Sequence, residues 1–388
     1  MSFREKIAGK EIYILLFFVG LINLVIFRSL YGFHVNNDTE GFMSLIEAFR
    51  GNPALIYPPR YLNPLYAVWG SKVMFFVSAP HSLIIANIIS YFGIIFLMYG
   101  LVRRVFKNNY IAFISSLIMI TTYPMIRYLL TQVQDIGAYF WFTLTLYAGW
   151  RWWEGRNKSW LLLGGVAVSF GLLTKESGAM GALFVGMLFL LSKISWKERL
   201  VNFLQFSAFP FLTLVINYFR SKDVDFNSLD WFMREWKYDR IINFKFTTWL
   251  GVNVNTFNFL WVLVFIGAYL IIKNWKMIDR NIKIYIIAVF VPAFSYFAWP
   301  VYISRTVIIS GWLFIPIASY AIYVVYLKGG MYKKIAMVLL VVALVSPYIL
   351  QSTIRYAHLP AIIANCNNNI LCAWNYFWDN RGTFSKIR

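Results

Sequence analysis

Residues 82–102 read SLIIANIISYFGIIFLMYGLV, and the basic stretch RRVFKNN follows at 103–109. A helix that crosses a bilayer needs about 20 consecutive apolar residues. The first stretch therefore predicts a transmembrane helix, and the second predicts the charged loop that ends it. Similar apolar runs recur along the chain and predict eleven spans, at about 12–30, 82–102, 110–127, 134–150, 159–174, 178–192, 200–219, 249–272, 284–302, 306–327 and 335–353.

The composition agrees with a chain that lies mostly in lipid. Of the 388 residues, 60% are hydrophobic, 20% are aromatic and 13% are charged, whereas soluble domains carry about 25% charged residues. The composition therefore excludes an ordinary water-soluble fold and a disordered chain. The formal net charge of +20 is typical of basic cytoplasmic loops and of contacts with anionic lipids.

The charges of the loops predict an orientation. Six loops on one side each carry three or four Lys and Arg residues, and together hold 19 of the 36 bases but only five of the 16 acids. They lie at 1–11, 103–109, 151–158, 193–199, 273–283 and 328–334. Basic short loops face the cytoplasm, so the N-terminus is expected inside and the C-terminus outside. We expect a bacterial inner membrane.

One further apolar stretch, 61–79, is long enough to cross but contains Lys72 and Pro64. Counting it as a span would alternate the basic loops between the two sides, so we expect it to lie along the outer interface. The expected architecture is all-α, with one integral domain at 1–354 and an external tail at 355–388. Cys366 and Cys372 lie in this tail, where a disulfide or two free thiols are both open.

The first external loop, at 31–81, holds the most informative polar pattern. Phe42, Leu45, Ile46 and Phe49 share one face at helical spacing and predict an amphipathic helix, which Gly51 ends. Asn37 with Glu40 has the spacing of a capping box. Asp38 and Glu40 then have two interpretations: first-turn acids on a solvated helix, or paired catalytic carboxylates at the membrane surface.

Other charges stand at the external ends of the predicted spans, where a charge is costly unless it has a partner or a task. They are Arg60, Arg127, Asp135, Lys175, Glu176 and Arg305. The alternative is that the arginines snorkel to the interface and that Lys175 and Glu176 form an ion pair within a turn. A second large external loop, 220–247, interleaves charges with aromatic residues such as Trp231 and Trp236, and it predicts an interfacial segment or a solvated loop.

Several function classes lack their signatures. The sequence contains no Walker A motif, no G-x-S-x-G, no H-E-x-x-H and no dinucleotide fingerprint, and its three histidines are scattered. No internal repeat supports a transporter built from repeats. We expect no nucleic-acid partner, and the sequence assigns no cofactor with certainty.

Four segments together resemble the GT-C superfamily of polytopic glycosyltransferases, in its protein O-mannosyltransferase and lipid A aminoarabinose transferase branch. They are NNDTEGF (36–42), PPRYLNPLYAVW (58–69), QDIGAYFWFTLTLYAGW (134–150) and GLLTKESG (171–178). The resemblance covers about half of the chain. It implies a polyprenyl-phosphate-linked sugar donor, a glycan, lipid or protein acceptor, and inverting transfer at the outer face.

The resemblance also implies roles for single residues. An acid of the first loop is the base, which falls on Asp38, with Glu40 as a second acid. The two could also hold a divalent cation such as Mg²⁺ or Mn²⁺, although two acids alone do not require one. Arg60, Arg127, Lys175 and Arg305 would bind the donor phosphate, and Asp135, Glu176, Trp231 and Trp236 would face the sugar and acceptor. The alternatives left open are a flippase or transporter of a lipid-linked glycan and a polysaccharide polymerase or ligase.

Overall fold

The fold is known from a computed structural model, which describes residues 3–31, 38–53, 56, 58–224, 230, 233, 252–254, 256–295 and 307–353. These residues form helices, turns and loops, and no β-strand occurs among them. The contacts divide the chain into two compact units. Unit 1 comprises residues 1–120, 125–228 and 277–292, and unit 2 comprises 121–124, 229–276 and 293–388.

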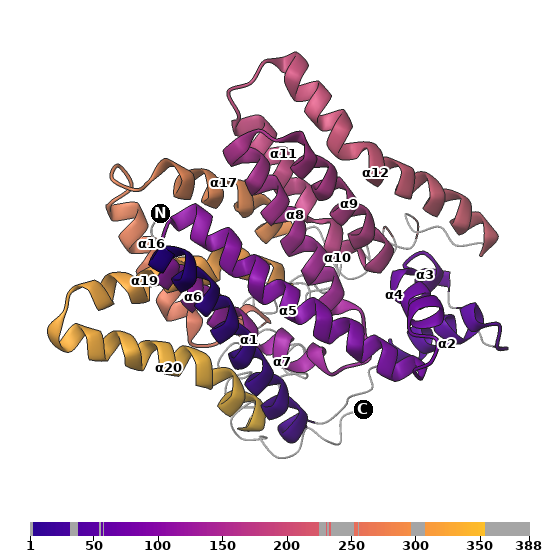
Figure 1. The fold of residues 1–388 in the computed structure, drawn as a ribbon, viewed down its shortest axis with the longest axis horizontal. Coiled ribbons are helices and arrows are strands. Elements are labelled where there is room, and N and C mark those ends of the chain that lie inside the picture. Colours follow the sequence, from indigo (N-terminus) through magenta and orange to yellow (C-terminus); the bar gives the residue numbers. More distant parts are fainter. Residues whose placement is uncertain are drawn as a thin grey trace. The chain divides into compact units, whose positions relative to one another are not determined.

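Unit 1 contains most of the helices (Figure 1). They are α1 (Phe3–Tyr31), α2 (Thr39–Arg50), α3 (Pro58–Tyr61), α4 (Leu65–Val68), the π-helix η1 (Trp69–Val73), α5 (Ala79–Phe106), α6 (Asn109–Ile120), α8 (Asp135–Gly155), α9 (Lys158–Thr174), α10 (Glu176–Ala179), α11 (Gly181–Leu191) and α12 (Trp196–Asp223), with most of α7 (Tyr123–Leu129) and α17 (Arg280–Phe294).

Each of the eleven predicted spans overlaps a helix, but the number of spans is not confirmed. In the part of the chain that the structure describes, five helices are long and apolar enough to cross a membrane, or six if α6 and α7 form one bent span. The five are Glu11–Ser29, Ala79–Phe106, Trp196–Asp223, Ile308–Leu327 and Gly330–Tyr348. The helices α9, α16 (Leu260–Lys273) and the run Glu176–Leu191 are apolar but shorter.

The centre of unit 1 is built from α5, α8 and α9, which lie side by side, with α12 packed on α9 (Figure 1). Large aromatic side chains of these helices are fully buried, among them Tyr91 of α5 and Phe142 and Trp150 of α8. Two helices approach closely where Gly165 faces the backbone carbonyl of Phe206, so a Cβ at this glycine would collide with α12. Small residues of this kind allow close helix packing in membranes, where apolar side chains gain little from leaving lipid.

The segment between α1 and α5 forms a group of short helices at the N-terminal end of α5 (Figure 1). The stretch 61–79 is divided among α3, α4, η1 and a turn, so no single helix in it is long enough to span a bilayer. Arg50 at the end of α2 fastens this group, because its Nη2 donates to the carbonyl oxygens of Gly70 at 2.7 Å and Val77 at 2.6 Å.

The amphipathic helix predicted in the first loop is α2. Phe42, Leu45 and Ile46 are buried on its inner face, and Gly51 follows with φ of +89°, a conformation that favours glycine. Asp38 directly precedes the helix, but its side chain makes no capping hydrogen bond. The capping box predicted for Asn37 lies outside the described residues.

Unit 2 contains α16, the 3₁₀-helix η4 (Ile308–Ser310), α19 (Gly311–Leu327) and α20 (Gly330–Thr353). Helix α19 packs against α16 and α20. Gly267 of α16 lies against the backbone of Ile317, again a close helix contact. Most of the loop 220–247, with Trp231 and Trp236, falls outside the described residues, as do Arg305 and the tail 355–388 with its cysteines.

Candidate functional site

Asp38 forms an ion pair with Arg60. Arg60 Nη2 donates to Asp38 Oδ1 at 2.6 Å, and the guanidinium carbon lies 4.6 Å from the centre of the Phe42 ring. The two side chains are 21% and 23% exposed, so they are shielded from bulk water but remain reachable. The pair joins the start of α2 to α3, two elements separated by the first-loop segment that contains Pro53. A charge-assisted hydrogen bond of this kind fixes the direction of the carboxylate.

A second ion pair joins α8 to the link between α9 and α10. Lys175 Nζ donates to Asp135 Oδ1 at 2.6 Å. Asp135 is the first residue of α8 and its side chain is only 2% exposed, while that of Lys175 is 15% exposed. Lys175 breaks the helix because its backbone is extended between α9 and α10. The alternative interpretation, an ion pair between Lys175 and Glu176 within the turn, is therefore wrong, because Lys175 pairs with Asp135 of a different helix.

Glu176, the neighbour of Lys175, connects the two ion pairs through Asn63. Asn63 Nδ2 donates to Glu176 Oε1 at 3.1 Å, and the backbone N–H of Asn63 donates to the carbonyl oxygen of Arg60 at 3.0 Å. Gln134 Nε2 lies 3.5 Å from the carbonyl oxygen of Asn63. We call Asp38, Arg60, Asn63, Asp135, Lys175 and Glu176 the charged cluster.

Buried polar side chains hold the stretch of backbone that leads into Asp135. Asn87 of α5 is fully buried, and its Nδ2 donates to the carbonyl oxygens of Thr131 at 3.0 Å and Val133 at 2.9 Å. The Tyr66 hydroxyl donates to Asn87 Oδ1 at 3.3 Å. Burial raises the pKa of Tyr66, so its hydroxyl stays neutral and keeps its proton at physiological pH.

The sequence did not single out Asn63, Tyr66, Asn87 or Gln134. Asn63 and Tyr66 lie in the segment PPRYLNPLYAVW, but neither side chain is charged, and only the fold brings them to the cluster. A polar residue inside an apolar span was the available signal for Asn87, because a buried amide needs hydrogen-bond partners.

The remaining predicted site residues differ in their placement. Glu40 lies in the first turn of α2 and is exposed. Arg127 is exposed near the end of α7, four residues before Thr131. Arg305, Trp231 and Trp236 lie outside the described residues, so their predicted roles stay predictions.

The acids of the first loop fit a divalent cation poorly. One oxygen of Asp38 already accepts from the Arg60 guanidinium, which competes with a metal for the carboxylate. Within the described ranges, no group of three His, Cys, Asp or Glu side chains lies close enough together to hold a metal ion. The Asp38 carboxylate is therefore assigned to its ion pair with Arg60 and not to a metal ion.

The C-terminal end of α12 also contacts this region. The Arg220 guanidinium donates to the carbonyl oxygen of Tyr61 and lies over its ring, 4.5 Å from the centre. Tyr61 is the residue after Arg60, so a helix with a mostly exposed apolar surface contributes to the position of the charged cluster.

The charged cluster offers a carboxylate held in place by a guanidinium, a lysine ammonium, and a buried acid. These groups suit proton removal from a hydroxyl and stabilisation of a phosphate. Residues 63–218, which include four members of the cluster, match a protein-family model described as dolichyl-phosphate-mannose-protein mannosyltransferase. No curated protein matches the sequence.

The fold has a counterpart among solved structures. The oligosaccharyltransferase of Archaeoglobus fulgidus in its apo form matches with a TM-score of 0.63 and 13% identity over 90% of this chain. The chain resembles the GT-C glycosyltransferases. The same archaeal enzyme, AglB, in complex with an inhibitory peptide and a dolichol-phosphate, matches with a TM-score of 0.56 and 14% identity over 90% of this chain. Both matches span 56% of the length of the archaeal protein. The GT-C resemblance predicted from the four sequence segments is thereby confirmed.

Proposed function

We propose that the protein transfers a sugar from a polyprenyl-phosphate-linked donor to an acceptor at the outer face of the membrane. The observation that carries the proposal is the charged cluster, which gathers the predicted acids and bases of four separate segments within a fold shared with an oligosaccharyltransferase. The family model and the fold both belong to glycosyltransferases. The basic loops of the sequence favour the cytoplasm for the opposite end of α5 and α8.

Asp38 is the proposed base. Its carboxylate removes the proton of an acceptor hydroxyl as the oxygen attacks the anomeric carbon of the donor sugar. A new bond forms between this oxygen and the anomeric carbon, while the bond from that carbon to the phosphate oxygen breaks and the phosphate leaves with the electron pair. A single displacement inverts the anomeric configuration. Arg60 orients the carboxylate for this step, and it is a positioning residue for Asp38 as well as a phosphate ligand.

Cations at the cluster stabilise the departing phosphate. A guanidinium has five N–H donors and an ammonium three, so Arg60 and Lys175 can each reach a phosphate oxygen while they keep their carboxylate contacts. Arg127 and Arg305 complete the proposed phosphate-binding set. Asp135 and Glu176, with Trp231 and Trp236, are the residues that we propose to face the sugar and acceptor.

The test compares purified wild-type protein with Asp38→Asn in detergent, supplied with radiolabelled polyprenyl-phosphate sugars and a membrane extract as acceptor. The amide that replaces the carboxylate cannot take up the proton, so the rate of label transfer should fall by about 10²–10⁴-fold. Glu40→Gln is the matched control, because it removes a charge from the exposed side of the same first turn and should retain most of the rate.

Two results would contradict this assignment. Transfer retained by Asp38→Asn and lost by Glu40→Gln would move the base to Glu40. Transport of lipid-linked sugar across vesicles that contain the protein, without transfer to any acceptor, would favour a flippase. The charged cluster would then bind the sugar phosphate during its passage and Asp38 would have no chemical role.

A further inference from the structure

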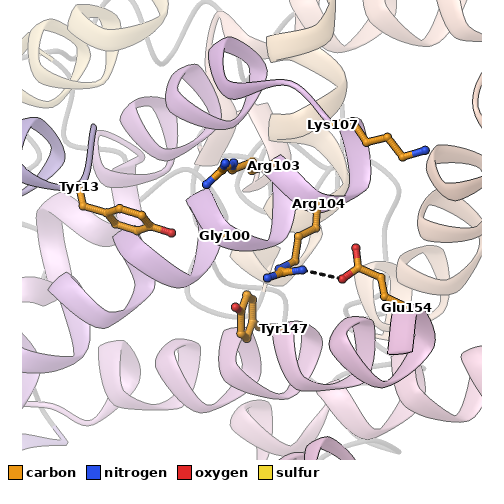
Figure 2. Close-up of a pocket in the computed structure, with 7 residues that line it drawn as sticks. All are labelled: Tyr13, Gly100, Arg103, Arg104, Lys107, Tyr147 and Glu154. Carbon is orange, nitrogen blue, oxygen red and sulfur yellow. Dashed lines mark hydrogen bonds and ion pairs between the residues drawn. The ribbon is translucent and has the colours of Figure 1, made fainter. Parts of the chain in front are cut away.

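A pocket lies at the other end of α5 and α8, far from the charged cluster along these helices. It encloses about 360 Å³, in the range of small-ligand sites, and is lined by Tyr13, Gly100, Arg103, Arg104, Lys107, Tyr147 and Glu154 (Figure 2). Asp135 begins α8 and Glu154 is near its end, so about 30 Å of helix separates the cluster from this site, which we call the basic pocket.

The charges of the basic pocket do not cancel. Arg104 Nη1 donates to Glu154 Oε2 at 2.8 Å, and Lys107 Nζ donates to Asp279 Oδ2 at 2.9 Å. Arg103 is the third cation, and within the described ranges no carboxylate lies within ion-pair distance of it. In Figure 2 the Arg103 side chain extends toward the side where Tyr13 lies, whereas Lys107 extends away from it. The pocket therefore has one surplus positive charge.

Neutral hydrogen-bonding groups stand beside this charge. Tyr13 and Tyr147 bring two phenol groups to the lining, and Arg151 Nη1 donates to the Tyr147 hydroxyl at 3.2 Å, which directs the proton of that hydroxyl elsewhere. A guanidinium fork with a phenol donor is a favourable arrangement for phosphate oxygens, which accept bidentate hydrogen bonds from arginine. Gly100 allows the Tyr147 ring to lie close to the backbone of α5, because a Cβ at this position would be only 3.0 Å from the ring.

The surroundings favour a lipid as the source of the phosphate. Tyr13 stands on α1, where the residues that follow it, Ile14, Leu15 and Phe18, are 57%, 49% and 54% exposed. Only 22% of the apolar window of α1 is buried, so the helix that carries Tyr13 offers an exposed apolar surface next to a lining residue of the pocket. Acyl chains can lie along this surface while the headgroup phosphate enters the pocket. Basic pockets between transmembrane helices bind anionic headgroups in this way.

We propose that the basic pocket binds the phosphodiester headgroup of an anionic membrane phospholipid. The single negative charge of the phosphodiester matches the surplus charge of Arg103. Helix stability alone accounts for basic residues in the last turn of α5, where they interact with the carbonyl end of the helix, but it does not require a cavity with two phenols beside them.

The test measures lipid retention by the full chain, purified in detergent and mixed with phosphatidylglycerol or with phosphatidylcholine, by native mass spectrometry. Wild type should retain phosphatidylglycerol at least tenfold more strongly than phosphatidylcholine. Arg103→Gln should lose this preference by roughly tenfold, because one charge-assisted contact to the phosphate disappears. Lys158→Gln is the matched control, since it removes an exposed charge just after α8 without lining the pocket.

A second variant covers the case in which Arg103→Gln does not fold. Arg103→Lys keeps the charge but removes the guanidinium fork, and it should give an intermediate preference for phosphatidylglycerol.

A comparison with inorganic phosphate distinguishes a lipid from a soluble phosphate. Inorganic phosphate should raise the melting temperature of the protein far less than phosphatidylglycerol does. An equal stabilisation by inorganic phosphate would overturn the lipid assignment in favour of a soluble phosphate. Equal retention by wild type and both Arg103 variants would overturn the site itself. Neither outcome depends on sugar transfer, so the proposed function is tested separately.

Discussion

The two ends of α5 and α8 hold ion pairs in contrasting surroundings. At the charged cluster, Asp135 and Lys175 are 2% and 15% exposed, whereas at the basic pocket the side chains of Lys107 and Asp279 are 65% and 40% exposed. Separating a buried ion pair leaves an uncompensated charge in the protein interior, which costs several kcal/mol. An exposed pair contributes little to the free energy of unfolding. The same kind of contact therefore fixes geometry at the charged cluster and contributes little to stability at the basic pocket.

Lys175→Met should cause the largest loss of stability among the variants that test this comparison. It takes the cation away from the buried Asp135 carboxylate, and removing one partner of a buried pair costs about 3–5 kcal/mol. Thermal unfolding in detergent, followed by circular dichroism, would measure the loss. The double variant Asp135→Asn with Lys175→Met removes both charges and should recover most of the stability. No recovery would mean that Lys175 stabilises the fold through its packing.

Asn87→Ala should cause the next largest loss of stability, because three backbone carbonyl groups near Asp135 would lose a shared amide donor. The carbonyl oxygens of Thr131 and Val133 are the two with the shortest contacts. Leaving buried polar groups without a donor costs about 1–3 kcal/mol each. The same unfolding assay measures the change, and Ser90→Ala at the neighbouring buried hydroxyl is a milder control. A loss below that of Ser90→Ala would show that water replaces the amide.

Lys107→Met repeats the lysine substitution at the exposed end. The pair with Asp279 is largely solvated, so the expected loss is below about 1 kcal/mol. Measured beside Lys175→Met in the same buffer, it isolates the effect of burial. Equal losses for the two variants would remove the contrast between the ends. Raising the salt concentration should reduce the Lys107 effect further, because screening acts on exposed charges.

The smallest predicted effect concerns pH. The backbone N–H of Asn281 and the Lys107 ammonium hold the pKa of Asp279 below its ordinary value. Its contribution to stability is therefore present above the ordinary carboxyl pKa and is lost as the pH falls through the lowered value. Asp279→Asn should flatten the acid side of the melting-temperature profile slightly and leave neutral pH almost unchanged. An unaltered acid side would assign the acid sensitivity to other carboxylates.

The helical architecture could be read from the sequence because apolar runs and charged loops follow directly from the solvent properties of a bilayer. Helix α2 was predictable from a different signal, the helical spacing of Phe42, Leu45 and Ile46. The number of spans was not predictable in this way. Apolar helices such as α9 and α11 are shorter than a span, and hydropathy does not distinguish them from full crossings.

The charged cluster was predictable in its members but not in its pairing. Charges at the ends of apolar runs pointed to Arg60, Asp135 and Lys175, because lipid makes an isolated charge costly, and the acid pair at the start of the first-loop helix pointed to Asp38. Which acid meets which base depends on distant segments, and the nearest partner in sequence was the wrong one for Lys175. Asn63 entered the cluster only through the fold, because an uncharged amide gives no signal in a hydropathy pattern.

The length of α12 links the charged cluster to the thickness of the membrane. α12 begins with WKER and ends with RSKD, so its apolar part is 200–219, which is about 30 Å long and matches the ~30 Å hydrocarbon layer. Its Arg220 holds the backbone of Tyr61, next to Arg60, so the tilt of α12 bears on the position of the guanidinium that orients Asp38. In a thinner or thicker bilayer α12 would have to tilt or shift, so lipids of different acyl length should change the position of Arg60 without contacting any residue of the charged cluster.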